Sequence, residues 1–211
     1  MTAPEQFTAA FWDERYGSSE KIWSGEPNAV LVQEVADLAP GTALDVGSGE
    51  GGDAIWLAAR GWTVTAIDVS RVGLERVAAR AAAEGLGERV ATALVDVFAD
   101  PIPGPQDLVT AHFLQLPADV RPRILSALAG AVAPGGRLLL VGHDPEGMPE
   151  EFAGHHPPEM FATADQLVAE LAEALDGWTI EVAERRARTG VQPDGRPGFP
   201  YDAVLRARRP L

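Results

Sequence analysis

A glycine-rich stretch, Asp45-Val-Gly-Ser-Gly-Glu-Gly-Gly52, holds the residues of this sequence best suited to contact a ligand. It follows a short apolar run that predicts a strand and precedes a run that predicts a helix, so its backbone can bend tightly and approach a ligand closely. The stretch matches the G-x-G-x-x-G spacing. Loops with this spacing bind either NAD(P) or S-adenosylmethionine, and the spacing alone does not decide between them.

Two acidic residues, Asp45 and Glu50, flank the glycines Gly47 and Gly49. A dinucleotide would place a pyrophosphate dianion on this loop, where carboxylates raise the negative potential against it. S-adenosylmethionine carries no phosphate; carboxylates attract its sulfonium and ammonium, and amides at a helix start can bind its carboxylate. The loop therefore favours S-adenosylmethionine, with these four residues as predicted contacts. The alternative is that Asp45 only accepts hydrogen bonds from loop amides.

Two further aspartates end the second and third predicted strands. Asp68 follows the loop by about twenty residues, where a carboxylate can accept hydrogen bonds from both ribose hydroxyls. Asp96 could accept a hydrogen bond from the adenine amino group, and we expect Val69 and Val97 to line the same site. Alternatively, Asp68 is the N-cap of the next helix, a place that Ser70 suits better, and Asp96 only caps its loop.

Histidines end two other predicted strands, His112 after the fourth and His143 after the fifth. Either could be a catalytic general base if the acceptor must lose a proton, and His112 could also contact the cofactor. The alternative is a histidine that only makes structural hydrogen bonds. His155 and His156 could line a lid, but adjacent side chains project differently, so we expect no metal site. Trp23 could cover the sulfonium by a cation–π contact or simply pack on the core.

Short apolar runs alternate with longer amphipathic stretches, which predicts a doubly wound α/β fold around a mostly parallel sheet. Strands are predicted over residues 42–46, 62–67, 90–95, 107–111 and 136–141, and an antiparallel pair over 178–188 and 201–208. Helices are predicted over residues 52–60, 70–84, 117–132 and 164–175, with Ser70 as an N-cap and Pro117 in a first turn. Two earlier helices, over 4–16 and 28–38, resemble a cover over this core.

Length and composition favour a single domain, since 211 residues with 46% hydrophobic content can fill one core. We expect residues 1–40 to form the helical cover and 41–211 the core. The net charge of −14 disfavours nucleic acid as a partner, because its phosphates must be neutralised by clustered basic residues. There is no cysteine, no apolar run long enough to span a bilayer and no secretory signal pattern at the amino terminus, so we expect a cytoplasmic protein without a membrane partner.

The order of these motifs resembles that of the class I S-adenosylmethionine-dependent methyltransferases, over about residues 11–208. The motifs that carry the resemblance are the glycine loop at 45–51, Asp68, Asp96, Asp107-Leu-Val109 and Pro134-Gly-Gly136. The resemblance implies S-adenosylmethionine as cofactor and a seven-stranded sheet whose last strand is antiparallel.

Within that family, Trp12-Asp-Glu-Arg-Tyr16 and Trp23-Ser-Gly-Glu-Pro27 are similar to tellurite-resistance and thiopurine methyltransferases. This implies a small-molecule acceptor with a sulfur, nitrogen or oxygen nucleophile, and places Trp23 near the methionine end of the cofactor. The Asn/Asp-Pro-Pro-Tyr signature of enzymes that methylate nucleic-acid amino groups is replaced by His112-Phe-Leu-Gln115. Two alternatives remain: an NAD(P)-dependent oxidoreductase, supported by the glycine spacing and Asp68, and a non-catalytic S-adenosylmethionine-binding protein.

Overall fold

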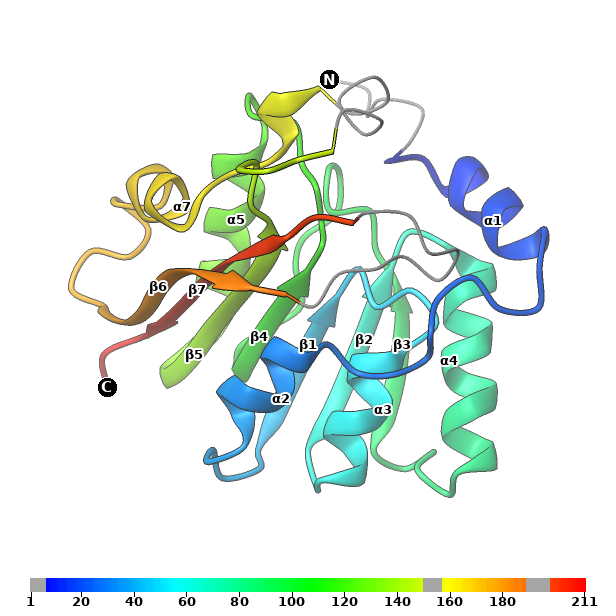
Figure 1. Cartoon of the computed structure of the whole chain (residues 1–211). Coiled ribbons are helices and arrows are strands. Elements are labelled where there is room, and N and C mark those ends of the chain that lie inside the picture. Colours follow the sequence, from blue (N-terminus) through cyan, green and yellow to red (C-terminus); the bar gives the residue numbers. More distant parts are fainter. Residues whose placement is uncertain (1–6, 150–156, 189–197) are drawn as a thin grey trace.

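One seven-stranded sheet, in the order β3-β2-β1-β4-β5-β7-β6, forms the centre of the computed structural model, which describes residues 7–149, 157–188 and 198–211 (Figure 1). The strands are β1 Thr42–Val46, β2 Thr63–Asp68, β3 Val90–Leu94, β4 Gln106–His112, β5 Val132–His143, β6 Thr179–Ala187 and β7 Tyr201–Arg208. Strands β1 to β5 pair in parallel, whereas β7 pairs antiparallel with both β5 and β6. The strand order reverses between β1 and β4, where ligands of doubly wound folds bind.

Helices lie on both faces of the sheet. They are α1 Ala9–Gly17, α2 Ala29–Val35, α3 Gly52–Ala59, α4 Arg71–Ala83, α5 Arg121–Gly130 and α7 Ala164–Glu170, with a short 3₁₀ turn at Pro158–Met160. Helices α2, α3 and α4 share one buried cluster with the sheet, and α5 and α7 share another. Within the described ranges, no helix is long and apolar enough to cross a membrane.

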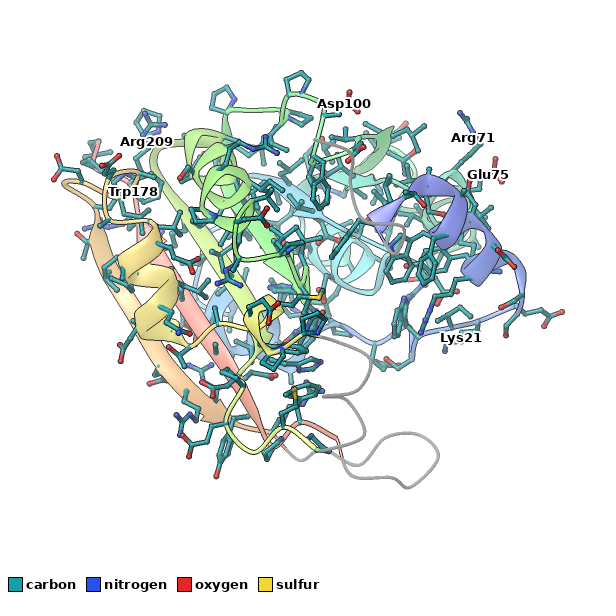
Figure 2. All side chains as sticks on the ribbon, turned by 90° about the horizontal axis from the view of Figure 1, so that it is seen from above. Lys21, Arg71, Glu75, Asp100, Trp178 and Arg209 are labelled. Atoms are coloured by element: carbon teal, nitrogen blue, oxygen red, sulfur yellow. The ribbon has the colours of Figure 1, made fainter. Side chains whose placement is uncertain are left out.

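Helix α4 shows how the sequence pattern selects the buried side. Gly73, Leu74 and Val77 are buried against the rest of the protein. Arg71 and Glu75 are exposed, and Figure 2 shows their side chains at the outer edge of the molecule. This spacing of three and four residues is that of an amphipathic helix, so the apolar stripe turns toward the sheet.

The predicted fold class is confirmed, including the parallel core and the antiparallel strand pair. Several bounds were wrong: α2 ends at Val35 rather than 38, β5 begins at Val132 rather than 136, and two helices differ by four residues or more at one end. Helix α5 begins at Arg121, because residues 117–120 form a turn and Pro122, not Pro117, occupies the first helical turn. Helix α7 ends at Glu170, and turns rather than helix continue to Gly177, which has a φ of 74°. The start of the predicted 4–16 helix lies partly outside the described residues.

Gly73 brings α4 close to the glycine loop. A Cβ atom at this position would lie 2.9 Å from the Gly49 carbonyl oxygen and 3.3 Å from Cε2 of Tyr16. We expect Gly73→Ala to lower the free energy of unfolding by about 1–3 kcal/mol, since backbone must move to relieve the overlap. Gly130→Ala is the matched control: nothing lies within 4 Å of its Cβ position, so it should be neutral or stabilising by up to about 1 kcal/mol. Urea denaturation of both variants measures the difference, and equal stabilities would contradict the close approach.

Candidate functional site

The glycine loop leaves β1 at the switch point of the sheet and leads into α3. Gly47, Gly49 and Gly51 have φ values of 70°, 53° and 81°, in the left-handed region that favours glycine. The Gly47 and Ser48 amides donate to the Ile67 carbonyl at 2.9 and 3.0 Å. The loop is therefore fixed to the end of β2.

Asp68, the last residue of β2, holds the loop from the side. Its Oδ2 accepts a hydrogen bond from the Gly49 amide at 2.9 Å, and its Oδ1 accepts one from the Ser70 amide at 2.8 Å. Burial raises the pKa of this carboxyl above its usual value. Ser70 caps α4 by accepting from the Gly73 amide at 3.1 Å, so Ser70 is the N-cap as predicted. Asp68 itself joins the loop to β2 at the place where a ribose was predicted.

Asp45 lies beneath the loop in a buried polar cluster. One of its carboxylate oxygens accepts a hydrogen bond from the Thr110 hydroxyl at 3.3 Å. The other, Oδ2, is buried and has no hydrogen-bond partner in the part of the chain that the structure describes. Burial, followed by the charge of Asp53, raises the pKa of Asp45 from 3.8 to about 7, while His112 opposes the shift. The predicted alternative for Asp45, a bond to loop amides, is absent from the hydrogen bonds of the described residues.

His112 ends β4 and belongs to the same cluster. Its Nδ1 lies 2.6 Å from Oδ2 of Asp53, in the first turn of α3, and its side chain is only 5% exposed. Its Nε2 is buried without a hydrogen-bond partner among the described residues. Asp53 was not among the predicted site residues, although the sequence places an acidic residue in the first turn of the helix that the glycine loop opens.

Glu50 points away from this cluster, toward the amino-terminal segment. Its carboxylate forms an ion pair with Arg76 of α4 and accepts a hydrogen bond from the Trp23 amide at 2.8 Å and from the Ile22 amide. The charge of Glu50, predicted to attract the cofactor, is thus compensated within the protein. Its visible role is to attach the amino-terminal segment to the loop.

Tyr16 and Trp23 lie over the glycine loop. The indole Nε1 of Trp23 donates a hydrogen bond to the Tyr16 hydroxyl at 3.2 Å. A Cβ atom at Gly49 would lie 2.8 Å from that hydroxyl and 3.5 Å from the indole nitrogen. Burial, with Asp68 nearby, raises the pKa of Tyr16 to about 12, so the hydroxyl keeps its proton. Trp23 is 46% exposed, so it borders the loop at the surface.

We expect Glu50→Gln to loosen this segment, because the neutral amide loses its ion pair with Arg76. Loss of a hydrogen-bonded charge partner typically costs about 1–3 kcal/mol. Tryptophan fluorescence and protease sensitivity of the segment around Trp23 should both change. Glu146→Gln removes an exposed pair with Arg185 of β6, away from this segment, and should change neither. Identical protease sensitivity of the two variants would contradict the attachment.

Asp96 and Val97 follow β3. The Oδ1 atom of Asp96 accepts a hydrogen bond from the Phe98 amide at 2.9 Å, which is the loop-capping arrangement weighed above. Val97 and Phe98 pack against the buried cluster under α5. Val69 is half-buried between Asp68 and Ser70. An adenine contact of Asp96 stays a prediction.

His143 ends β5 in an aromatic environment separate from His112. Its ring stacks on Phe199 with a centroid distance of 4.2 Å and lies 4.5 Å from Phe113. Its Nδ1 is 3.0 Å from an amino nitrogen of Arg188. The two predicted histidines are therefore in different surroundings, one under the loop and one among aromatic rings. His155 and His156 lie outside the described residues.

A cavity of about 40 Å³ adjoins His143. The ends of β4 and β5, α5, α7 and residues 160–162 line it, mostly with apolar side chains. Its polar wall includes Gln115, whose Nε2 is buried without a hydrogen-bond partner in the described ranges. Leu114, which also lines the cavity, would be 3.5 Å from a Cβ atom at Gly47. The cavity and the glycine loop are therefore neighbours.

Comparison with known proteins agrees with this geometry. Residues 43–136 match a family described as "Methyltransferase domain", and this range includes β1, the glycine loop, Asp68 and His112. A ribosomal RNA small subunit methyltransferase C from Alcanivorax borkumensis is 32% identical over 126 residues, which cover 56% of this chain and 38% of that protein. The matches span about a third of the length of the curated relatives.

Two solved structures extend the likeness to most of the chain. A protein from work on the conversion of a disulfide bond into a thioacetal group during echinomycin biosynthesis has a TM-score of 0.77 and 27% identity, covering 96% of this chain and 91% of that one. TehB from Haemophilus influenzae has a TM-score of 0.69 and 19% identity, covering 95% and 66%. Residues 43–136 therefore match a methyltransferase domain, and nearly the whole chain shares its fold with these two solved structures.

Proposed function

We propose that this chain transfers the methyl group of S-adenosylmethionine to a small-molecule acceptor. The observation that carries the proposal is the acidic glycine loop: Asp45, two residues before Gly47, presents a buried carboxylate oxygen without a partner in the described part of the chain. A buried acceptor of this kind suits an ammonium group. The carboxylates of Asp45 and Asp68 would instead repel the pyrophosphate of NAD(P).

The other residues of the loop fit the same cofactor. The Ser48 hydroxyl is buried and has no partner among the described residues, so it can donate to the cofactor carboxylate. Each carboxylate oxygen of Asp68 accepts one amide and keeps a further lone pair for a ribose hydroxyl. In this proposal Val69, Asp96 and Val97 border the adenine, and Trp23 borders the methionine end.

The bound cofactor would supply an electrophilic methyl group, and the protein would orient the acceptor on the axis of the reactive bond. Such orientation is worth about 7–11 kcal/mol in favourable systems. We place the acceptor on the side of the small cavity beside Leu114 and Gln115, because this cavity is apolar and adjoins the loop; at about 40 Å³ it would have to widen to admit one. Its apolar walls favour an acceptor with a hydrophobic body.

The two predicted bases have different charged neighbours. Nδ1 of His143 lies 3.0 Å from Arg188 and 3.5 Å from a carboxylate oxygen of Asp202. Asp53 holds Nδ1 of His112, which suits a general base that acts through Nε2. We propose an acceptor that needs no base, such as a thiolate or a neutral heterocyclic nitrogen, with His112 as the base if the acceptor must lose a proton. The solved relative connected with disulfide-to-thioacetal conversion supports sulfur chemistry.

A small-molecule acceptor also agrees with the charge of the chain. The relative named as a ribosomal RNA methyltransferase raises RNA as the second candidate. A net charge of −14 would repel the phosphates of an RNA substrate.

We propose that the chain acts as one domain, in which residues 1–40 cover the core formed by residues 41–211. The contacts of Tyr16 and Glu50 with the glycine loop and with α4 support this arrangement.

A methyl-transfer assay that detects S-adenosylhomocysteine tests the function. The acceptor panel should contain aromatic and aliphatic thiols, heterocyclic amines, phenols and a ribosomal RNA fragment. We expect turnover with thiols or heterocyclic amines, and no comparable binding of NADH by calorimetry. Faster turnover of RNA would overturn the small-molecule assignment. Tight S-adenosylhomocysteine binding without any turnover would identify a non-catalytic binding protein instead.

A further inference from the structure

Phe113 turns the chain out of β4 and into the wall of the apolar cavity. Its φ of 55° is left-handed, and among the described residues it is the one residue other than glycine with this backbone. An aromatic residue adopts such a backbone only where its surroundings hold it there. Here the Phe113 amide donates to the Val141 carbonyl at 2.7 Å, and the Phe113 carbonyl accepts from the Gln115 amide at 3.0 Å. The turn therefore fixes the backbone of Gln115 relative to β5.

Gln115 brings a hydrogen-bond donor to this cavity. The residue lines the cavity, and its side-chain nitrogen Nε2 is buried without a partner in the ranges that the structure describes. An amide nitrogen carries two hydrogens and only donates, and buried donors are nearly always satisfied in folded proteins. We therefore expect whatever occupies the cavity to present a hydrogen-bond acceptor to Gln115.

Arg121, the one arginine or lysine in the described lining of the cavity, is already bound by protein groups. Its Nε and Nη2 donate to the two carboxylate oxygens of Glu170 at 2.8 and 2.6 Å, and its Nη1 donates to the Glu159 carbonyl at 2.9 Å. An ionised group in the cavity would have to compete with Glu170 for this guanidinium. His143 also lines the cavity, with its Nδ1 beside Arg188, and most of the remaining lining is apolar. The cavity therefore suits an uncharged group.

The size of the cavity fits one end of a molecule. A buried water needs about 10–15 Å³, so a cavity of about 40 Å³ has room for about three atoms of that size, as in an acetyl group. Leu114, which precedes Gln115 and also lines the cavity, is 3.5 Å from the Cβ position of Gly47. A molecule whose end lies in the cavity can therefore extend past Leu114 to the glycine loop.

We propose that Gln115 determines acceptor specificity: its side-chain amide donates a hydrogen bond to an uncharged carbonyl oxygen or ring nitrogen, at the end of the methyl acceptor opposite its nucleophile. This inference rests on the proposed function and names the class of acceptor. An acceptor with only an alkyl group at this end leaves the buried Nε2 unpaired, which a site with a buried donor rejects. An anionic end is buried beside an arginine that Glu170 already neutralises.

Two fragments without a nucleophile test the binding of this end alone. Acetophenone carries a carbonyl group, and isopropylbenzene has nearly the same shape without a hydrogen-bond acceptor. We expect the cofactor-free protein to bind acetophenone about tenfold more tightly in an NMR titration, because one buried hydrogen bond separates the two fragments. Gln115→Met, which keeps the length of the side chain without its amide, should remove this preference.

The side-chain amide signals of Gln115 locate the contact. They are identified by their absence from the spectrum of Gln115→Met, and acetophenone should move them downfield whereas isopropylbenzene should not. The matched control is Gln33→Met, which replaces an exposed glutamine of α2 and should leave both affinities unchanged. Equal binding of the two fragments, binding of neither, or the same preference in Gln115→Met would overturn the proposal.

Methyl transfer to thiols that carry the same groups separates this inference from the proposed function. We expect Gln115→Met to raise the KM of para-acetylthiophenol about tenfold at a similar kcat, and to leave both constants of para-isopropylthiophenol unchanged. An equal loss with both thiols would show a structural role of Gln115, and a lower KM for para-mercaptobenzoate than for the acetyl compound would overturn the uncharged class. If no thiol is methylated while acetophenone still binds through Gln115, the methylation of thiols fails and the carbonyl site stands.

Discussion

Replacing Asp68 with alanine should weaken the binding of S-adenosylhomocysteine about ten- to a hundredfold. The proposed ribose bonds go to a charged acceptor, and their loss corresponds to about 1.5–3 kcal/mol. The same carboxylate holds the Gly49 amide, so the variant also releases the loop that the cofactor must contact. Isothermal titration calorimetry of the folded variant measures both the affinity and the number of sites.

A matched control separates affinity from stability. Asp107 accepts hydrogen bonds from the Thr42 amide and hydroxyl at 2.8 and 2.9 Å. Both residues lie where β1 and β4 begin, at the end of these strands away from the glycine loop. Asp107→Ala therefore removes a carboxylate with similar bonds, far from the loop. It should lower the melting temperature without changing the dissociation constant. If Asp68→Ala behaves like Asp107→Ala, Asp68 has only a structural role.

Asp45→Asn should make the protein more stable above pH 7 and bind S-adenosylhomocysteine more weakly. The pKa of Asp45 is raised from 3.8 to about 7 in the folded state. Between these two values the folded state holds a proton that the unfolded state has released, so the free energy of unfolding falls as pH rises from about 4 to 7. Above pH 7 the folded protein carries the full penalty of a buried charge. A neutral amide avoids it, and we expect a gain in melting temperature on the order of 5 °C at pH 8.

The affinity of the wild-type protein for S-adenosylhomocysteine should also follow the titration of Asp45, but it should rise with pH where the free energy of unfolding falls. Ionised Asp45 attracts the ammonium of the ligand and the neutral acid does not, so affinity should rise with pH between about 6 and 8, at most about tenfold per unit. Asp45→Asn should abolish this rise. Thermal denaturation and calorimetry from pH 5 to 8.5 measure both effects. A pH-independent affinity in the wild type, or a lower melting temperature of Asp45→Asn at pH 8, would contradict a buried ionisable acceptor.

The sequence was sufficient to predict the strands, the glycine loop and the helix cap at Ser70, because each depends on local periodicity or on a short motif. It was not sufficient to predict the partners of the charged residues. Glu50 stands beside the loop in sequence, yet it pairs with Arg76 in α4. Asp53 and His112 are 59 positions apart and meet only because α3 and β4 lie at the same edge of the sheet.

The difference between local sequence signals and tertiary contacts also explains why the predicted start of α5 was wrong. Pro117 is a good first-turn residue by type, but Pro122 serves equally well, and local preference cannot choose between them. The packing of Ile124, Leu125 and Leu128 against the sheet selects the later start. Local signals therefore predicted the type of each element, and tertiary contacts determined where it begins.

The position of β7 between β5 and β6 has a consequence for synthesis of the chain. Residues 137–143 of β5 pair with residues 202–208 of β7, so this side of β5 remains an open edge until more than sixty further residues have left the ribosome. That edge is rich in leucine and valine and is a template for pairing with other nascent chains. In the finished sheet the edge is β6, which carries Glu181, Glu184, Arg185 and Arg186. Docking of the β6–β7 hairpin therefore replaces an aggregation-prone edge with a charged one that resists association.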